Sequence, residues 1–252
     1  MHPFDALHGT DTGALIPGEE LATGHRHDRH ITAYHGTAPS LFRKLVKQWQ
    51  QRARHPLEKT AFVDVGAGKG RAMLLAAELP FRRIVGVELH PALAAAARKN
   101  VEIFLARGGR AVSGRMSAQS TLAAKNAAKL GHVGCVPMRV EEADVMRLRM
   151  PAGPCCVFLF NPFDLVLMDR FLDKLTRDFR GREDELDLLY VNDEQRDLIQ
   201  QEHSRLREVW RGRIFLSHED RDADKRTIQH CAEGLYVTSG YEDCSVWRLR
   251  SS

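Results

Sequence analysis

A glycine-rich turn followed by an acid is the part of this chain whose residue types and spacing indicate chemistry. An apolar strand leads into Gly66-Ala67-Gly68-Lys69-Gly70, a helix follows, and a second apolar strand ends in Glu88. Glycines at alternate positions let the backbone turn sharply and leave space for a ligand against it. The first turn of the helix directs its N–H groups at that ligand, and Glu88 can accept hydrogen bonds from both hydroxyls of a ribose. The pattern predicts a nucleotide-cofactor site in an open α/β sheet.

Two details distinguish between the possible cofactors. The dinucleotide fingerprint is G-x-G-x-x-G, whereas the spacing here is G-x-G-x-G and Arg71 stands in place of the third glycine. Asp64 is an acid inside the first apolar strand, where it would repel a pyrophosphate and attract the ammonium group of a methionine moiety. A phosphate-binding loop is excluded because G-x-x-x-x-G-K-[ST] does not occur. The turn therefore predicts a site for S-adenosyl-L-methionine.

These motifs resemble those of the class I S-adenosylmethionine-dependent methyltransferases. Asp64-Val65-Gly66-Ala67-Gly68-Lys69-Gly70 is similar to their first motif, Gly86-Val87-Glu88-Leu89 to their second, and Phe158-Leu159-Phe160-Asn161-Pro162-Phe163 to their fourth. More narrowly, the segments "FVDVGAGKGR…PFRRIVGVELHPAL" and "FLFNPF" resemble a bacterial methyltransferase family whose substrates are mostly unassigned. The likeness is good over residues 60–192 and weak over the C-terminal part. Together the motifs are specific for the cofactor and not for the methyl acceptor.

Strand and helix patterns alternate along the chain, which is typical of a mostly parallel sheet. Strands are predicted at residues 61–65, 83–88, 136–140, 156–160 and 186–191, with short ones at 213–216 and 245–249. Helices are predicted at residues 40–51, 71–79, 92–106, 165–179 and 193–205. With the resemblance, the expected fold is α/β: a Rossmann-like, doubly wound, mostly parallel sheet with an antiparallel C-terminal strand.

The expected organisation is an N-terminal lid followed by one catalytic domain. Residues 1–55 are predicted to form a lid segment and a helix, and residues 56–252 the S-adenosylmethionine-binding domain. A stretch rich in Ala, Ser, Lys and Gly at about 110–134 is interpreted as an insertion, with a further helix at 117–130.

Ligands in such sheets bind outside the carboxyl ends of the strands. The predicted cofactor-binding residues at these ends are Asp64, Gly66, Ala67, Gly68, Gly70, Glu88, Leu89, Glu142, Ala143 and Asn161. Glu142 follows the third strand, where the resemblance implies an acid near the adenine amino group. Asp144 takes this role if the strand ends two residues later.

The candidate catalytic residues are Asn161, His35 and Tyr34. Amino-group methyltransferases often end the fourth strand with Asp or Asn, two prolines and an aromatic residue, whereas this chain has one proline after Asn161. Asn161 is expected to line the cofactor or acceptor pocket, either as a catalytic group or as part of a turn. Tyr34 and His35 resemble a segment that covers the cofactor, so that His35 could act as a general base.

Composition sets limits on the partners. A net charge of +4 permits a nucleic-acid partner without requiring one, and no apolar run approaches the length of a membrane span. Five scattered cysteines lack metal-ligand spacing, and Cys155 and Cys156 are expected to be buried thiols of a cytoplasmic protein. The histidines near residue 30 have no spacing that predicts a metal site.

The sequence thus predicts an enzyme that transfers a methyl group from S-adenosyl-L-methionine to an unidentified acceptor, either a small molecule or a protein side chain. Two alternatives stay open: a non-catalytic cofactor-binding module and, less favoured, an NAD-type oxidoreductase. The acceptor atom (N, O, C or S) and the oligomeric state are not predicted.

Overall fold

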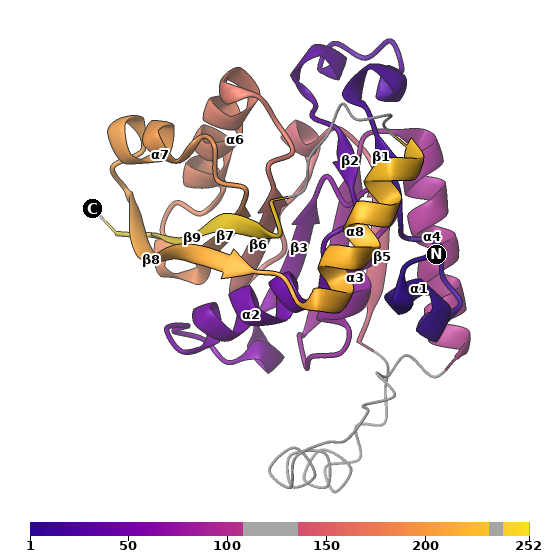
Figure 1. Ribbon diagram of the computed structural model, residues 1–252. Helices are drawn as coiled ribbons and strands as arrows, with labels where there is room; N and C mark the ends of the chain where they lie inside the picture. Colours follow the sequence, from indigo (N-terminus) through magenta and orange to yellow (C-terminus); the bar gives the residue numbers. More distant parts are fainter. Residues whose placement is uncertain (108–135, 232–238, 252) are drawn as a thin grey trace, which may run out of the picture.

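The computed structural model describes residues 1–107, 136–231 and 239–251 (Figure 1). The insertion predicted at about 110–134, with its helix at 117–130, lies outside the described residues.

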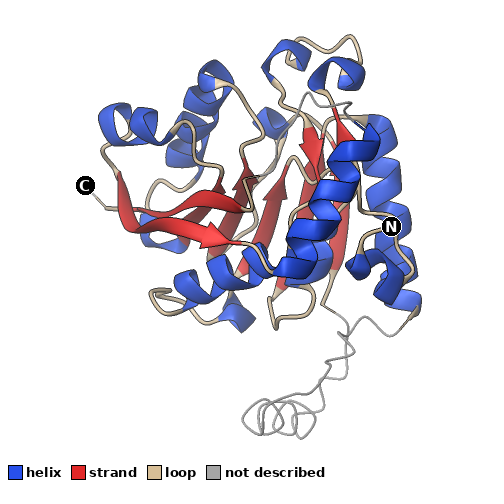
Figure 2. Ribbon diagram, in the orientation of Figure 1, coloured by secondary structure: helices blue, strands red, loops and turns tan. Residues whose placement is uncertain are grey.

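A mostly parallel sheet forms the centre of the described structure (Figure 2). Its seven described strands have the order β5-β4-β3-β6-β7-β9-β8. They are β3 (Ala61–Val65), β4 (Arg83–Glu88), β5 (Met138–Glu142), β6 (Cys155–Phe160), β7 (Leu186–Val191), β8 (Leu206–Phe215) and β9 (Tyr241–Leu249). β9 is antiparallel to both of its neighbours and lies between β7 and β8. The predicted fold class, with its antiparallel C-terminal strand, is confirmed.

Helices cover both faces of the sheet (Figures 1 and 2). The described helices are α1 (Pro3–His8), α2 (Pro39–Gln50), α3 (Arg71–Ala76), α4 (Pro91–Ala106), α6 (Leu165–Asp178), α7 (Arg196–Glu202) and α8 (His218–Cys231). Short 3-10 helices are η1 (Gly18–Leu21), η2 (Asp28–His30), η3 (Leu57–Lys59), η4 (Val145–Arg147) and η5 (Glu183–Glu185). One apolar core unites α2, α3 and α4 with one face of the sheet, and a second unites α6 and α7 with the other.

Apolar sequence explains these layers. The central strand β3 is buried along its whole length, as expected for a strand covered on both faces. α2 buries Leu41, Phe42, Leu45, Val46 and Trp49, which recur at helical spacing. The indole of Trp49 also donates a 2.7 Å hydrogen bond to Asp187 on β7. This bond fixes the position of α2 over the sheet.

Several element boundaries differ from the prediction. The third strand runs to Glu142, two residues beyond the predicted end, because its edge position leaves it with alternating polar residues and no clear stop. β8 is longer than the predicted 213–216, and α7 is shorter than the predicted 193–205. The helices α1 and α8 were not predicted from sequence. Cys155 and Cys156 are buried free thiols, as predicted.

The N-terminal segment is folded over the carboxyl ends of the strands. Its two-stranded ribbon pairs β1 (Leu15–Ile16) with β2 (Tyr34–His35). Ile31 forms an isolated bridge with Phe163, just beyond β6. α8 packs against α1 and β1. The N-terminal segment and α8 therefore cover the end of the sheet at which ligands are expected. Among the described helices, none has the length and apolar character needed to span a membrane.

Candidate functional site

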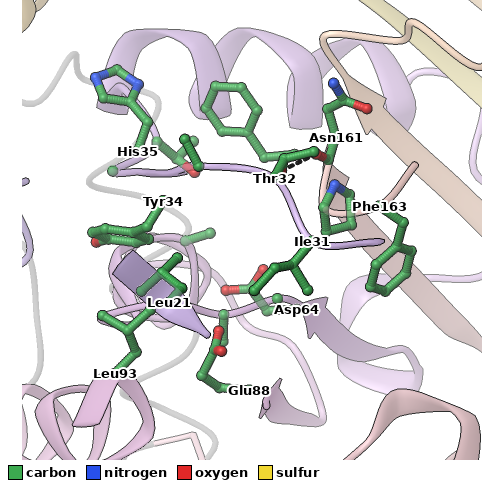
Figure 3. Close-up of a pocket in the computed structure, with 18 of the residues that line it drawn as sticks. Leu21, Ile31, Thr32, Tyr34, His35, Asp64, Glu88, Leu93, Asn161 and Phe163 are labelled. Atoms are coloured by element: carbon green, nitrogen blue, oxygen red, sulfur yellow. Dashed lines mark hydrogen bonds between the residues drawn. The ribbon is translucent and has the colours of Figure 1, made fainter. Parts of the chain in front are cut away.

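A cavity of about 570 Å³ lies at the carboxyl ends of the central strands (Figure 3). Its floor includes residues that follow β3, β4 and β6, and its cover includes the segment from Ile31 to Thr37 and part of α8. Figure 3 shows the carboxylates of Asp64 and Glu88 on one side of this space and Asn161 and His35 on the other. The volume is within the range of roughly 300–1,000 Å³ found for small-molecule sites.

The glycine turn adopts a backbone that other residues avoid. Gly66, Gly68 and Gly70 have φ angles of +70°, +54° and +88°. A Cβ atom on Gly68 would lie 2.0 Å from a ring carbon of Tyr34, and one on Gly70 would lie 3.3 Å from Ala97 Cβ on α4. Glycine is therefore required at these positions both by the backbone and by the close approach of neighbouring elements.

Asp64 presents an unsatisfied carboxylate oxygen to the cavity. Its side chain is almost wholly buried, at 3% exposure, and its Oδ2 atom has no hydrogen-bond partner among the described residues. Burial, with the nearby negative charge of Glu88, raises the pKa of Asp64 to about 8. A buried acid without a partner is costly, so this position favours a ligand that carries a positive charge.

Glu88 holds the glycine turn in shape. Its two carboxylate oxygens accept hydrogen bonds from the backbone N–H groups of Gly68 and His90, both at 2.8 Å. Burial raises the pKa of Glu88, whereas these bonds oppose that shift. A carboxylate offers about four lone pairs, so about two remain for further hydrogen-bond donors in the cavity.

At the end of β5, the structure places Asp144 and Ala143 at the cavity, while Glu142 does not line it. Glu142 is the last residue of β5 and pairs with Arg98 on the surface at 3.2 Å. Glu142 does not reach the cavity because β5 ends two residues later than predicted. Asp144 is buried, accepts a hydrogen bond from Met146 N at 2.9 Å, and lies 3.5 Å from His27 Nε2.

Asn161 is held in a left-handed conformation at the end of β6, with φ +37°. Its side-chain oxygen accepts a bond from the Tyr190 hydroxyl at 3.1 Å. Its carbonyl accepts one from the Thr32 hydroxyl at 2.6 Å (Figure 3). Asn192, at the end of β7, is also left-handed, with φ +49°. Such strain in non-glycine residues is typical of functional sites, and both residues line the cavity.

Tyr34 and His35 lie in the cover of the cavity. The Tyr34 ring packs on Gly68, and its hydroxyl donates a 2.8 Å bond to the carbonyl of Thr12. Burial raises the pKa of Tyr34, which keeps it a neutral phenol. Burial, together with the positive charge of Arg71, lowers the pKa of His35 to about 4, so its imidazole is uncharged at pH 7. His35 Nε2 lies 3.6 Å from Asp224 Oδ1.

The cover is attached through a buried network that sequence reasoning missed. Arg71, in the first turn of α3, donates hydrogen bonds to Asp5 at 3.1 Å and to the Thr12 hydroxyl at 2.7 Å. Both Arg71 and Asp5 side chains are only 2% exposed. Lys69 pairs with Asp11 at 3.1 Å. No pattern in the sequence predicts a contact between residues so far apart along the chain. The sequence does single out Arg71, because it stands where the dinucleotide fingerprint has its third glycine.

Most of the predicted site residues meet at this cavity. Lining it are Asp64, Gly66, Ala67, Glu88, Leu89, Ala143, Asn161, Tyr34 and His35. Gly68 and Gly70 shape the turn beneath Tyr34 and α4, and Glu142 is on the surface. Over residues 1–107, 136–231 and 239–251, no three His, Cys, Asp or Glu side chains converge so as to hold a metal ion.

No protein-family model matches the sequence, and a search among curated proteins finds no match. Solved structures align with most of this chain at low sequence identity. A putative methylase, HI0767 from Haemophilus influenzae, aligns over 83% of this chain and 88% of its own, at 12% identity and a TM-score of 0.47. A putative RNA methyltransferase, PH1948 from Pyrococcus horikoshii, aligns over 82% and 81%, at 12% identity and a TM-score of 0.46. An RNA methyltransferase from Salinibacter ruber, in complex with S-adenosyl-L-homocysteine, aligns over 83% and 92%, at 14% identity and a TM-score of 0.40.

Proposed function

We propose that this protein is an S-adenosylmethionine-dependent methyltransferase that acts on a small molecule or a protein side chain. The observation that carries the proposal is the buried, unsatisfied carboxylate of Asp64 beside the glycine turn. A cofactor whose amino-acid end carries an ammonium group would supply the missing partner.

The surrounding residues fit the rest of such a cofactor. Glu88 keeps lone pairs for the ribose hydroxyls, and Ala143 and Asp144 lie where the adenine ring is expected. Leu89 and Leu93, which also line the cavity, offer apolar contact to the base. When bound, this cofactor supplies an electrophilic methyl group, so the protein needs no covalent intermediate.

What this chain's residues contribute is position and the exclusion of water. The N-terminal cover, tied down through Arg71 and Asp5, closes the cavity above the glycine turn. A closed site holds the acceptor atom in line with the methyl carbon, at about 3 Å. His35, uncharged at neutral pH, is available there as a proton acceptor.

The charged groups around the turn disfavour a dinucleotide. A pyrophosphate needs free cations or N–H groups, but Arg71 is bound to Asp5 and Lys69 to Asp11. Asp64 would also repel the phosphates. An NAD-type oxidoreductase is therefore the weaker proposal.

Calorimetric titration of the purified protein tests this assignment. We expect micromolar binding of S-adenosyl-L-methionine and S-adenosyl-L-homocysteine, and no binding of NADH. Asp64→Asn keeps the shape of the side chain and removes its charge. It should lower the affinity for S-adenosyl-L-homocysteine at least about tenfold. Asp197→Asn, an exposed acid on α7, is the matched control and should have no effect. Binding of NADH alone, or full affinity in Asp64→Asn, would overturn the proposal.

A further inference from the structure

Three further carboxylates line the cavity, in addition to those of Asp64, Glu88 and Asp144. Asp224 on α8, Glu242 on β9 and Glu194 just after β7 all line the cavity. In the sheet order, β7 lies three strands from β4, which carries Glu88, and β9 lies four. At about 4.8 Å per strand, this is a distance of ~14–19 Å. By this measure Glu194 and Glu242 are separate from Glu88, while Asp224, on α8, lies against His35 in the cover of the cavity.

Asp224 is buried, and no charged basic side chain among the described residues is bonded to it. Its side chain is 6% exposed and, in the part of the chain that the structure describes, it accepts no hydrogen bond. Over the described residues, the basic group in contact with it is His35, at 3.6 Å, which is uncharged at neutral pH. Arg71 lowers the pKa of Asp224, but its guanidinium is hydrogen-bonded to Asp5. The lone pairs of the Asp224 carboxyl group are therefore available to a ligand in the cavity.

Like charges surround this group. Burial raises the pKa of Asp224 to about 7, and the charges of Asp220 and Glu242 act in the same direction. Burial also raises the pKa of Glu242 to about 7, with the charges of Asp243 and Glu194 adding to the shift. These acids repel one another, so the free protein carries an energetic cost that a bound cation would relieve.

We propose, building on the methyltransferase function proposed above, that the methyl acceptor is a protonated amine whose ammonium group binds between Asp224 and Glu242. The walls next to these acids suit the carbon stem of such an amine. Phe160 and Ile228 line the cavity there, and the Phe160 ring meets His35 edge-on at 6.2 Å between centroids. A cation over an aromatic ring is attracted by its face.

In the proposed methyl transfer, a carboxylate in the cavity accounts for the proton that the acceptor must lose. The ammonium first gives one proton to the Asp224 carboxylate, which leaves a lone pair on nitrogen. That pair forms the N–C bond to the methyl carbon as the C–S bond breaks. The bonding electrons stay on sulfur, which turns the sulfonium into a neutral thioether, and the product nitrogen is a methylated ammonium.

The acidic lining argues against a nucleic acid as the acceptor. A phosphate backbone would be repelled by Asp224, Glu242 and Glu194 on entry, whereas proteins that bind nucleic acids rely on basic contacts to phosphate. An amine can come from a free small molecule or from a lysine side chain of a protein. The two sources share the same ammonium chemistry.

Ligand titration of the complex with S-adenosyl-L-homocysteine tests the proposal. The probes are n-pentylamine, its neutral counterpart 1-pentanol, cadaverine, a lysine-containing peptide and a short RNA. We expect the amines to bind at least about tenfold more tightly than pentanol, and labelled methyl groups from S-adenosyl-L-methionine to appear on them. Preference for cadaverine or for the peptide identifies a free amine or a protein lysine as the source.

Variants separate the two sites. Asp224→Asn and Glu242→Gln should each weaken amine binding about tenfold or more and leave the affinity for S-adenosyl-L-homocysteine within about twofold. Asp222→Asn, an exposed acid on the same helix, is the matched control and should change neither affinity.

The outcomes distinguish failure of this inference from failure of the proposed function. Equal binding of amine and pentanol, methylation of the RNA instead of the amines, or unchanged amine affinity in both variants would overturn the amine assignment alone. Absence of S-adenosyl-L-homocysteine binding would overturn the proposed function and this inference with it.

Discussion

Arg71 and Asp5 form a buried ion pair, 3.1 Å between nitrogen and oxygen, that joins the helix after the glycine turn to the first helix of the chain. Asp5 also accepts hydrogen bonds from the backbone N–H and the hydroxyl of Thr12. The pair thereby connects the glycine turn to the segment that covers it. The cover is thus part of the folded core and not a separate flap.

Loss of one partner of this pair should destabilise the protein strongly. Asp5→Asn leaves the guanidinium of Arg71 buried and uncompensated, which typically costs about 3–5 kcal/mol of unfolding free energy. Urea denaturation measures this change. Asp184→Asn, which removes an ion pair with Arg54 whose side chains are about half exposed, is the control and should cost about 0–1 kcal/mol. Similar small losses in both variants would contradict the structural role of the buried pair.

Gly68→Val should abolish cofactor binding. The new Cβ would lie 2.0 Å from the Tyr34 ring, so that either the turn or the cover must move. Gly181→Ala is a matched control, because Gly181 also has a positive φ, +80°, but a Cβ atom added there would have no other atom within 4 Å. Calorimetry with S-adenosyl-L-homocysteine checks both variants. Unchanged affinity in Gly68→Val would mean that the site lies elsewhere.

Glu88→Ala should make the binding free energy of S-adenosyl-L-homocysteine less favourable by roughly 1–3 kcal/mol. The reason is that the ribose hydroxyls and two backbone N–H groups lose their acceptor. Free adenine, which has no ribose, serves as the control ligand, and its binding free energy should change less. An effect below a few tenths of a kcal/mol on S-adenosyl-L-homocysteine would show that the ribose does not contact Glu88.

Cofactor affinity should rise with pH. The pKa of Asp64 is about 8 in the free protein, so near pH 6 the carboxyl holds a proton that an ammonium ligand must displace. Binding therefore releases a proton, and affinity should increase by up to about tenfold per pH unit until about pH 8. Calorimetry in buffers of different ionisation enthalpy measures the released proton. Asp64→Asn should show a flat profile, and a flat profile in the unaltered protein would contradict the assignment.

Titration of Asp64 also makes the unfolding free energy depend on pH. In the unfolded chain, an aspartate has a pKa of 3.8, below that of folded Asp64. Between about pH 4 and pH 8 the folded state thus binds more protons than the unfolded state, and this group's contribution to unfolding free energy falls as pH rises. Asp224 and Glu242, with pKa values of about 7, act in the same direction. Denaturation curves of Asp64→Asn across this range should show a shallower decline.

The central strands could be predicted from sequence because they are buried on both faces. Ala61–Val65 and Leu186–Val191 are each apolar except for a single aspartate, and their bounds agree with the prediction. β5 is an edge strand with alternating Arg139 and Glu141, and it ends two residues beyond the predicted position. That small shift decides whether Glu142 or Asp144 faces the cavity.

Features held by distant polar contacts could not be predicted. α8 has few apolar residues, and its position depends on Asp220, which accepts a 2.7 Å bond from the backbone of Ser40 on α2. The Arg71–Asp5 pair likewise joins residues that are far apart in sequence. Local periodicity carries no information about such contacts.

The position of β9 also imposes an order on folding. Among the described strands, β8 pairs with β9 alone, and β9 pairs with β7. β8 can therefore join the sheet only after residues 241–249 have emerged from the ribosome. The glycine turn needs only β3, β4 and their neighbours, whereas Glu242 arrives with β9. During synthesis, the chain would acquire the half that contains the glycine turn first and the half that contains Glu242 last.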